Sequence, residues 1–296
     1  MRRFSGVRLA VVGSVLVGLL ALVPALPASA TSSSSSNNYL ALGDSVPFGY
    51  SPLLVKAGVS PSLFVGYPEL VSNLFRPKLN VVNASCPGET SASLITGLRP
   101  DNGCQDYRQL PAALHVSYQG SQLKFAERYL AANRGTKFVS LMIGANDLFL
   151  LQDSCAAAAN VTACLQAGLP GVLGTVQANL VTIYSGLRAA GYRGTFVAVT
   201  YYSTNYTNPA LTGAVQALDG VLATVTRSYG GKVASGFAAF AAASAFRGGD
   251  PCAAGLLIHL TSSTCDEHPS RAGAELLALA LYSAVDPWWP NTKPRT

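Results

Sequence analysis

Charged residues are scarce in this 296-residue chain: Lys, Arg, Asp and Glu together make up 11% of it, and there are only three histidines. A nucleic-acid-binding surface needs a dense basic face that displaces counterions from phosphates, so this composition argues against a nucleic-acid partner. Hydrophobic residues make up 49% of the chain. That fraction is ample for one large core and excludes a disordered protein.

Long apolar runs are absent after the first 30 residues, and no later segment has the ~18 continuous apolar residues that a membrane-spanning helix requires. The one such run, residues 9–26, follows three arginines and precedes Ala28-Ser29-Ala30. This pattern predicts a secretory signal peptide over residues 1–30. Its removal takes away three arginines and no acids, so the net charge falls from +6 to +3. We expect a secreted protein without a stable membrane anchor.

Domain boundaries are also missing from the rest of the chain. Residues 31–38 (TSSSSSNN) are too polar to pack and predict a flexible leader. From residue 39 onward there is no internal repeat and no second linker-like segment. We therefore expect a single domain over residues 39–296, acting as a monomer.

Strand-like and helix-like segments alternate through this domain. The expected strands are 39–42, 79–82, 137–143, 195–200 and 232–233, and the expected helices are 67–75, 121–133, 172–190, 211–229 and 269–283. Such alternation predicts parallel strands joined by right-handed crossovers, and hence a three-layer α/β/α sandwich with a central, mostly parallel sheet. Ligands bind such sheets beyond the carboxyl ends of the strands.

No CxxC pair occurs among the six cysteines, which argues against a zinc site. An even number of cysteines in an oxidising compartment favours disulfides, although fifteen pairings are possible in principle. We favour neighbour pairing because each loop then staples a Gly/Pro/Asn-rich segment between predicted elements: Cys86–Cys104, Cys155–Cys164 and Cys252–Cys265. No metal and no cofactor is expected.

Two common enzyme motifs are missing as well, the G-x-S-x-G of α/β-hydrolases and the G-x-x-x-x-G-K-[ST] of phosphate-binding loops. Polar residues nevertheless follow three of the predicted strands: Ser45 in Gly43-Asp44-Ser45, Gly88 in Cys86-Pro87-Gly88, and Asn146 in Gly144-Ala145-Asn146-Asp147. A fourth, His268 in Asp266-Glu267-His268, comes just before the last predicted helix.

These four blocks, in this order, resemble those of the SGNH (GDSL-type) hydrolase family, and the resemblance covers nearly all of residues 39–296. The chain is most similar to the secreted bacterial lipases and esterases of that family that carry three disulfides. The resemblance implies a flavodoxin-like α/β/α fold and the hydrolysis of a small-molecule or lipid ester.

Chemistry assigns each block a role. A hydroxyl is a poor nucleophile until a base takes its proton, so Ser45 is the candidate nucleophile and His268 the candidate general base. The tetrahedral intermediate needs donors around its negatively charged oxygen. The backbone N–H groups of Ser45 and Gly88 and the side-chain amide of Asn146 are the candidate oxyanion-hole donors.

The acid is where this chain departs from the family. The family's acid usually lies three residues before the histidine, where this chain has Cys265, and Asp266 lies only two before. Two alternatives stay open: Asp266 orients the imidazole, or the backbone carbonyl of Cys265 does so.

Other polar residues near the blocks have plainer interpretations. Asp44 and Asp147 are interpreted as local turn stabilisers and Glu89 as a charge in the first turn of a helix. His115 and His259 fall in no strand-end motif, so we interpret them as surface or packing residues.

The substrate is indicated only by apolar segments. Tyr201 and Tyr202 follow the fourth predicted strand and are expected near the substrate pocket. Residues 234–246 contain no charged residue and either line an acyl-chain site or, as we favour, form a buried hairpin or core segment. Both features favour lipid or fatty-acyl esters. The alternatives are a carbohydrate esterase of the acetyl-xylan type and a non-enzymatic secreted binding module that stacks ligands on Trp288 and Trp289.

Overall fold

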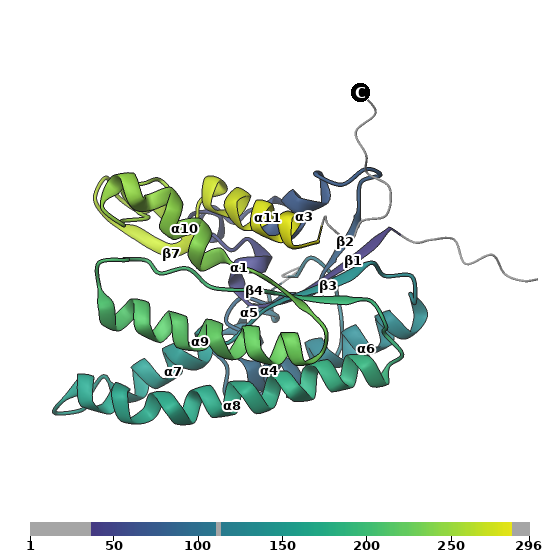
Figure 1. Cartoon of the computed structure of the whole chain (residues 1–296), viewed down its shortest axis with the longest axis horizontal. Helices are drawn as coiled ribbons and strands as arrows, with labels where there is room; N and C mark the ends of the chain where they lie inside the picture. The colour runs from purple at the N-terminus through teal and green to yellow at the C-terminus, as the bar shows by residue number, and fades with distance from the viewer. Residues whose placement is uncertain (1–36, 111–113, 286–296) are drawn as a thin grey trace, which may run out of the picture. The chain divides into compact units, whose positions relative to one another are not determined.

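Five parallel strands form the central sheet of the computed structural model, which describes residues 37–110 and 114–285 (Figure 1). Their order is β2-β1-β3-β4-β5. Their bounds are β1 (Asn38–Gly43), β2 (Asn80–Asn83), β3 (Phe138–Met142), β4 (Thr195–Val199) and β5 (Lys232–Ala234). Because β1 pairs with both β2 and β3, the strand order reverses at β1, which is where such sheets bind ligands. The expected signal peptide, most of the leader, and Trp288 and Trp289 lie outside the described residues.

The two central strands are apolar on both faces. All five residues of β3 are buried, as are the five residues of β1 from Tyr39 to Gly43. A parallel strand that is covered by helices on both sides consists of consecutive apolar residues. The sequence therefore predicts these two strands well.

Helices cover both faces of the sheet, which makes the predicted three-layer α/β/α sandwich. On one face lie α3 (Tyr67–Ser72) and α11 (Arg271–Val285), with α10 (Gly236–Ser244) packed on α11 (Figure 1). The other face carries α6 (Gln122–Ala132), α8 (Val161–Ala189) and α9 (Pro209–Ser228). In α6 the buried Leu123, Ala126 and Leu130 recur at helical spacing and face the core.

Four of the five expected helices begin at other residues than predicted, and the largest difference is at α8. Helix α8 begins at Val161 rather than at residue 172 and continues through Pro170. Proline and glycine disfavour a helix interior. Helix α8 nevertheless packs against α7 (Ala145–Cys155), and the Cys155–Cys164 disulfide joins the two helices. Helix α11 begins at Arg271 because Pro269 belongs to the preceding strand, β7.

The loops contain short elements that the sequence pattern does not reveal. These are α1 (Ser45–Phe48), α2 (Pro52–Lys56), α4 (Ser91–Thr96), α5 (Cys104–Tyr107), the 3-10 turns η1 (Pro61–Leu63) and η2 (Ala245–Arg247), and an antiparallel pair, β6 (Leu257–His259) and β7 (Cys265–Pro269). Helices of one or two turns are not stable alone and depend on tertiary contacts. Residues 234–246 form the end of β5, α10 and η2, so the expected hairpin is wrong, whereas Ala234 and Phe240 of this segment do belong to the core.

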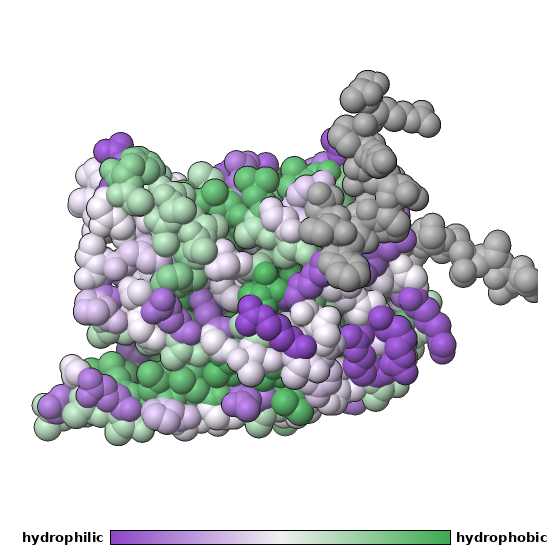
Figure 2. All heavy atoms as spheres, viewed as in Figure 1, coloured by the Kyte–Doolittle hydropathy of each residue, from purple (hydrophilic) through white to green (hydrophobic). Residues whose placement is uncertain are grey.

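Hydrophobic residues form a band along the seam between α8 and α9 on the face seen in Figure 2. Residues 154–187, which include most of α8, contain no charged residue. None of the helices in the described part of the chain has both the length and the hydropathy needed to cross a membrane.

Candidate active site

Ser45 is the first residue of α1 and follows β1 after a tight turn. Asp44 caps this helix by accepting a hydrogen bond from the Val46 N–H at 3.0 Å, and it also accepts one from the Tyr201 hydroxyl. Burial raises the pKa of Asp44 to about 6, although these two hydrogen bonds oppose the rise. At Gly43 (φ 139°) a Cβ would lie 2.1 Å from the Met142 carbonyl oxygen, so only glycine fits where the turn passes β3.

His268 and Asp266 come from β7 and meet Ser45 from the other end of the chain. His268 Nε2 lies 2.8 Å from Ser45 Oγ, and His268 Nδ1 lies 2.5 Å from Asp266 Oδ1. Burial alone would raise the pKa of Asp266, but the hydrogen bonds and charge of His268 outweigh it and lower that pKa below its usual value. Within the described residues no hydrogen bond joins the Cys265 carbonyl to the imidazole. The geometry therefore corresponds to the Asp266 alternative.

The three residues expected to supply oxyanion donors line one cavity. Gly88 has φ 80°, and a Cβ there would lie 2.2 Å from the Asn102 carbonyl oxygen, so the loop requires glycine. Among described residues the N–H groups of Ser45 and Gly88 have no hydrogen-bond acceptor. The Asn146 amide donates one hydrogen bond to the Glu89 carbonyl at 2.9 Å, and its nitrogen carries a second hydrogen.

The cavity has a volume of about 310 Å³, at the small end of the range for ligand pockets. Its polar lining consists of the groups described above together with Asn102, Gly103 and Glu267. The rest is aromatic or apolar: Tyr50, Pro52, Pro87, Tyr107 and Phe149.

The sequence pattern does not single out Tyr50, Pro52, Asn102, Gly103, Tyr107 or Phe149. The first five follow no strand directly and belong to short helices or their flanks, and Phe149 lies within α7. One signal was present for Asn102. It lies between Cys86 and Cys104, so a disulfide between these cysteines brings it close to Gly88.

Tyr201 and Tyr202 do not line the cavity, contrary to the expectation. Both are buried: the Tyr201 hydroxyl donates to Asp44, and the Tyr202 hydroxyl donates to the Glu267 carbonyl at 2.7 Å. The Tyr202 ring also stacks on Phe240 of α10 at 4.0 Å between centroids. These tyrosines thus bond to the residues next to Ser45 and His268 in the chain and support them from there. Residues 234–246 likewise contribute nothing to the cavity lining.

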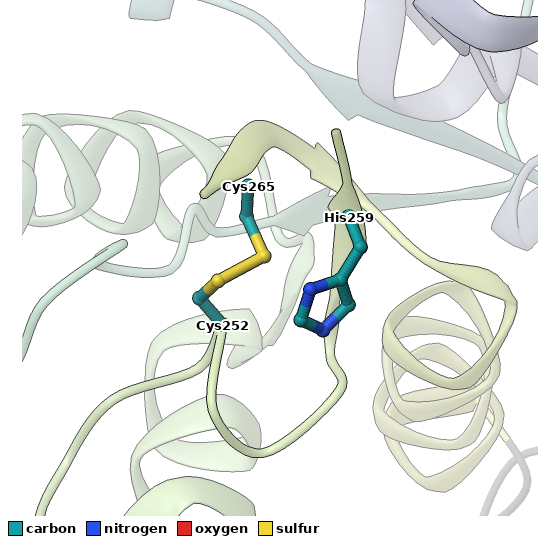
Figure 3. A group of neighbouring side chains, drawn as sticks. All are labelled: Cys252, His259 and Cys265. Carbon is teal, nitrogen blue, oxygen red and sulfur yellow. A yellow bond between two sulfur atoms is a disulfide. The ribbon is translucent and has the colours of Figure 1, made fainter. Parts of the chain in front are cut away.

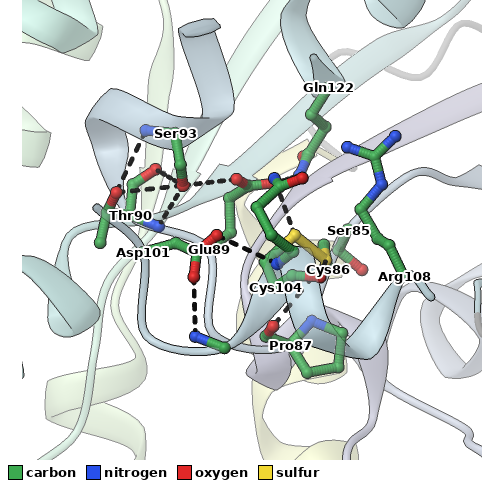
Figure 4. Close-up of a disulfide and its surroundings, with 12 residues drawn as sticks. Ser85, Cys86, Pro87, Glu89, Thr90, Ser93, Asp101, Cys104, Arg108 and Gln122 are labelled. Atoms are coloured by element: carbon green, nitrogen blue, oxygen red, sulfur yellow. Dashed lines mark hydrogen bonds between the residues drawn. A yellow bond between two sulfur atoms is a disulfide. The ribbon is translucent and has the colours of Figure 1, made fainter. Parts of the chain in front are cut away.

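Glu89 is a buried network residue rather than a helix-end charge (Figure 4). It accepts hydrogen bonds from the Ser93 hydroxyl at 2.5 Å and from Gln122 Nε2 at 3.1 Å. The same Gln122 amide donates to the Gly43 carbonyl and accepts from the Gly43 N–H at 2.6 Å. Burial raises the pKa of Glu89 to about 7, although the bonds from Ser93 and Gln122 oppose the rise. This buried bridge connects the loop of Ser45 to the loop of Gly88.

Asp147 also makes longer-range contacts than a local turn requires. It accepts hydrogen bonds from the Ser91 N–H at 2.8 Å and the Ser91 hydroxyl at 2.6 Å, which joins α7 to α4. His115 packs against Phe48, with its Nε2 3.0 Å from the Phe48 carbonyl oxygen, and His259 is exposed. Neither histidine belongs to the cavity lining.

The cysteines pair as the neighbour scheme predicts: Cys86–Cys104, Cys155–Cys164 and Cys252–Cys265. His259 lies beside the last of these disulfides (Figure 3), and Glu89 lies beside the first. Disulfide sulfurs carry no thiolate, so neither group offers the ligands of a metal site. In a third group of ligand-type residues, Asp266 is hydrogen-bonded to His268, and His268 is hydrogen-bonded to Ser45.

A serine hydroxyl bonded to an imidazole, which is bonded in turn to a carboxylate beside free N–H donors, is the arrangement found in serine hydrolases. The chain belongs to the GDSL-like lipase/acylhydrolase family, whose model matches residues 41–276. That is a family of carboxylic ester hydrolases, and the protein is therefore an enzyme rather than a binding module.

Solved structures with this fold act on different esters. The chain is similar to phospholipase A1 from Streptomyces albidoflavus NA297, with a TM-score of 0.54, 19% identity, and coverage of 84% of this chain and 99% of that one. It is similar to an extracellular lipase from Streptomyces rimosus, with a TM-score of 0.53, 18% identity, and coverage of 83% and 99%. It is also similar to a variant of an acetyl xylan esterase from Geobacillus stearothermophilus, with a TM-score of 0.52, 20% identity, and coverage of 84% of this chain and 94% of that one. At these identities the likeness concerns the fold alone. No curated protein sequence matches the chain significantly.

Proposed function

We propose that the protein is a secreted serine ester hydrolase that acts through an acyl-enzyme, with Ser45 as nucleophile, His268 as general base and Asp266 as the acid that orients it. The observation that carries this proposal is the continuous contact from Asp266 through His268 to Ser45, with distances of 2.5 Å and 2.8 Å.

The reaction starts when Ser45 Oγ attacks the ester carbonyl carbon while His268 Nε2 takes the hydroxyl proton. The oxyanion that forms accepts hydrogen bonds from the N–H groups of Ser45 and Gly88 and from the second amide hydrogen of Asn146. His268 then gives its proton to the leaving alcohol as the ester bond breaks. Water, deprotonated by His268, releases the acid by the same steps.

We propose esters of apolar acyl chains, such as lipid or fatty-acyl esters, as the substrates. Tyr50, Tyr107 and Phe149 give the cavity an aromatic lining, and the Tyr50 ring packs against His268 at 4.8 Å between centroids. Next to this lining, α2 begins at the cavity-lining Pro52 and leaves Leu53 and Val55 exposed, at 47% and 39% of their surface. Helix α7, which carries Phe149, leads into the uncharged residues 154–187. An apolar rim with few charges favours contact with an apolar ester.

The alternative is a carbohydrate esterase of the acetyl-xylan type. The small cavity volume suits a short acyl group, and the rings of Tyr50 and Tyr107 are suitable for packing against a sugar. This alternative uses the same catalytic groups and differs only in the groups on either side of the ester.

The two substrate classes are separated by measuring kcat/KM for a series of esters from acetyl to palmitoyl and, in parallel, for acetylated xylan. The proposal expects kcat/KM to rise from acetyl to medium or long chains. Activity on acetylated xylan above that on every longer ester would overturn it in favour of the alternative. Labelling of the wild type, and not of Ser45→Ala, by a fluorophosphonate probe tests the nucleophile separately.

Secretion and a monomeric state complete the proposal. Three disulfides are consistent with an oxidising compartment. Protein recovered from the culture medium of a secreting host should begin at Thr31, as N-terminal sequencing would show, and should run as a monomer in light scattering.

A further inference from the structure

We infer that Asn102 is a positioning residue that holds the amide of Asn146 in the one orientation that aims an N–H at the oxyanion. This inference rests on the proposed function, because it concerns one of the proposed oxyanion donors.

The hydrogen bonds around Asn146 determine which position its amide oxygen occupies and which its amide nitrogen. Its Nδ2 lies 2.9 Å from the Glu89 carbonyl oxygen, which can only accept, so this end must be the amino group. Its Oδ1 lies 2.9 Å from Asn102 Nδ2, which donates. The amide is therefore held between an acceptor on one side and a donor on the other, and both contacts oppose a flip.

A flip of this amide would remove the donor from the oxyanion site. Exchange of the two ends places Oδ1 of Asn146 against the Glu89 carbonyl and changes the hydrogen-bonding character of the group that faces the cavity. Preorganised donors stabilise the transition state because they need no reorientation when charge develops. A donor that rotates freely loses part of that effect.

Asn102 is well placed for this role because its backbone is anchored independently of its side chain. Its N–H donates to the Gly88 carbonyl at 2.8 Å. The preceding Asp101 accepts hydrogen bonds from the N–H groups of Gly103 and Gln105, both at 3.0 Å, and the Cys86–Cys104 disulfide closes the loop. The side chain itself is exposed and lines the cavity, so its replacement opens no hole in the core.

Two substitutions test the inference in different ways. Asn102→Leu has a similar size and removes the donor, while Asn102→Asp keeps the shape and puts an acceptor in its place. The Leu variant should lower kcat about tenfold, less than the 10²–10³-fold expected for Asn146→Ala, which removes the oxyanion donor itself. The Asp variant should lower kcat further, because its ionised carboxylate attracts the amino end of Asn146.

The decisive measurement repeats both substitutions in the Asn146→Ala background. If Asn102 acts through Asn146, the double variants should have the kcat of Asn146→Ala alone, and KM should change by less than about twofold throughout. Losses of kcat that add up in the double variants would overturn the inference, and so would a change in KM with kcat unaltered. Either outcome is expected if Asn102 contacts the substrate directly or acts only on the structure.

Asn208→Asp is the matched control for charge. Asn208 is exposed, caps α9 and accepts from the Ala210 and Leu211 N–H groups, and aspartate caps equally well. This variant should keep the wild-type kcat. An inactive wild type, or an active Ser45→Ala, overturns the proposed function and the inference with it. Unchanged kcat in both Asn102 variants, with Ser45→Ala inactive, overturns the inference alone.

Discussion

Asp266 Oδ1 and His268 Nδ1 lie 2.5 Å apart although only one residue separates them in the chain. The reason is that both belong to β7, and alternate residues of a strand point to the same side. Glu267 lies between them, and its carbonyl oxygen accepts a hydrogen bond from the Tyr202 hydroxyl at 2.7 Å. A spacing that differs from the family pattern by one residue is thereby compatible with a carboxylate on the imidazole.

Asp266→Asn should lower kcat about 10²–10⁴-fold with little change in stability, because the amide neither stabilises the imidazolium nor enforces its tautomer. Steady-state kinetics and a thermal melt measure this. Asp153→Asn, an exposed position at the end of α7, is the matched control and should keep full activity. A loss smaller than tenfold for Asp266→Asn would show that a backbone carbonyl suffices to orient His268.

Gly88→Ala should lower kcat about 10²–10³-fold, because the added Cβ meets the Asn102 carbonyl at 2.2 Å and displaces an oxyanion donor. Gly58 provides a matched control, since it has φ 64° and nothing lies within 4 Å of the place a Cβ would take there. Gly58→Ala should lose about 1–2 kcal/mol of stability from the left-handed backbone and keep the wild-type kcat. Equal kcat values for the two variants would contradict the role given to Gly88.

Glu89→Gln should become more stable relative to wild type as the pH rises. The pKa of Glu89 is raised from 4.5 to about 7, so the folded state binds its proton more tightly than the unfolded state does. This contribution to the free energy of unfolding is present below pH 4.5 and is lost as the pH rises towards 7. Glutamine cannot ionise, and the Ser93 hydroxyl can turn to donate to the Thr90 carbonyl while accepting from the new amide.

The measurement is urea unfolding of both proteins at pH 5 and pH 8. We subtract the unfolding free energy of wild type from that of Glu89→Gln at each pH. From pH 5 to pH 8 this difference should rise by an amount on the order of 3 kcal/mol. Glu275→Gln, at an exposed ion pair with Arg271, should show no such change. Parallel pH dependences for Glu89→Gln and wild type would mean that Glu89 titrates normally.

Removal of the Cys252–Cys265 disulfide should lower both stability and kcat, because Cys265 begins β7 and directly precedes Asp266. Replacement of both cysteines by serine is expected to cost ~2–4 kcal/mol. The same double replacement at Cys155 and Cys164, which joins α7 to α8, should have a similar cost in stability but leave kcat unchanged. Denaturant unfolding measures the stability of the two variants, and steady-state kinetics measures their kcat. An equal effect on kcat in both variants would rule out a local role for the Cys252–Cys265 disulfide.

The sequence by itself determined the sheet and the positions of four candidate site residues. Strands β1 and β3 are buried on both faces and therefore appear as uninterrupted apolar runs. Parallel strands end at one edge of the sheet, so Ser45 and Asn146, which follow β1 and β3, come together once the strand order is known. Local patterns suffice here because period and polarity record which residues are buried.

Only the tertiary structure decided the direction of individual side chains and the partners of buried polar groups. Tyr201 follows β4 as predicted, yet its hydroxyl turns inward to Asp44 instead of lining the cavity. Glu89, Gln122 and Asn102 act across 33 to 79 residues of sequence, through contacts that leave no periodic signal. The physical reason is that a buried polar group must find a hydrogen-bond partner wherever the packed chain supplies one, and local sequence does not record where that is.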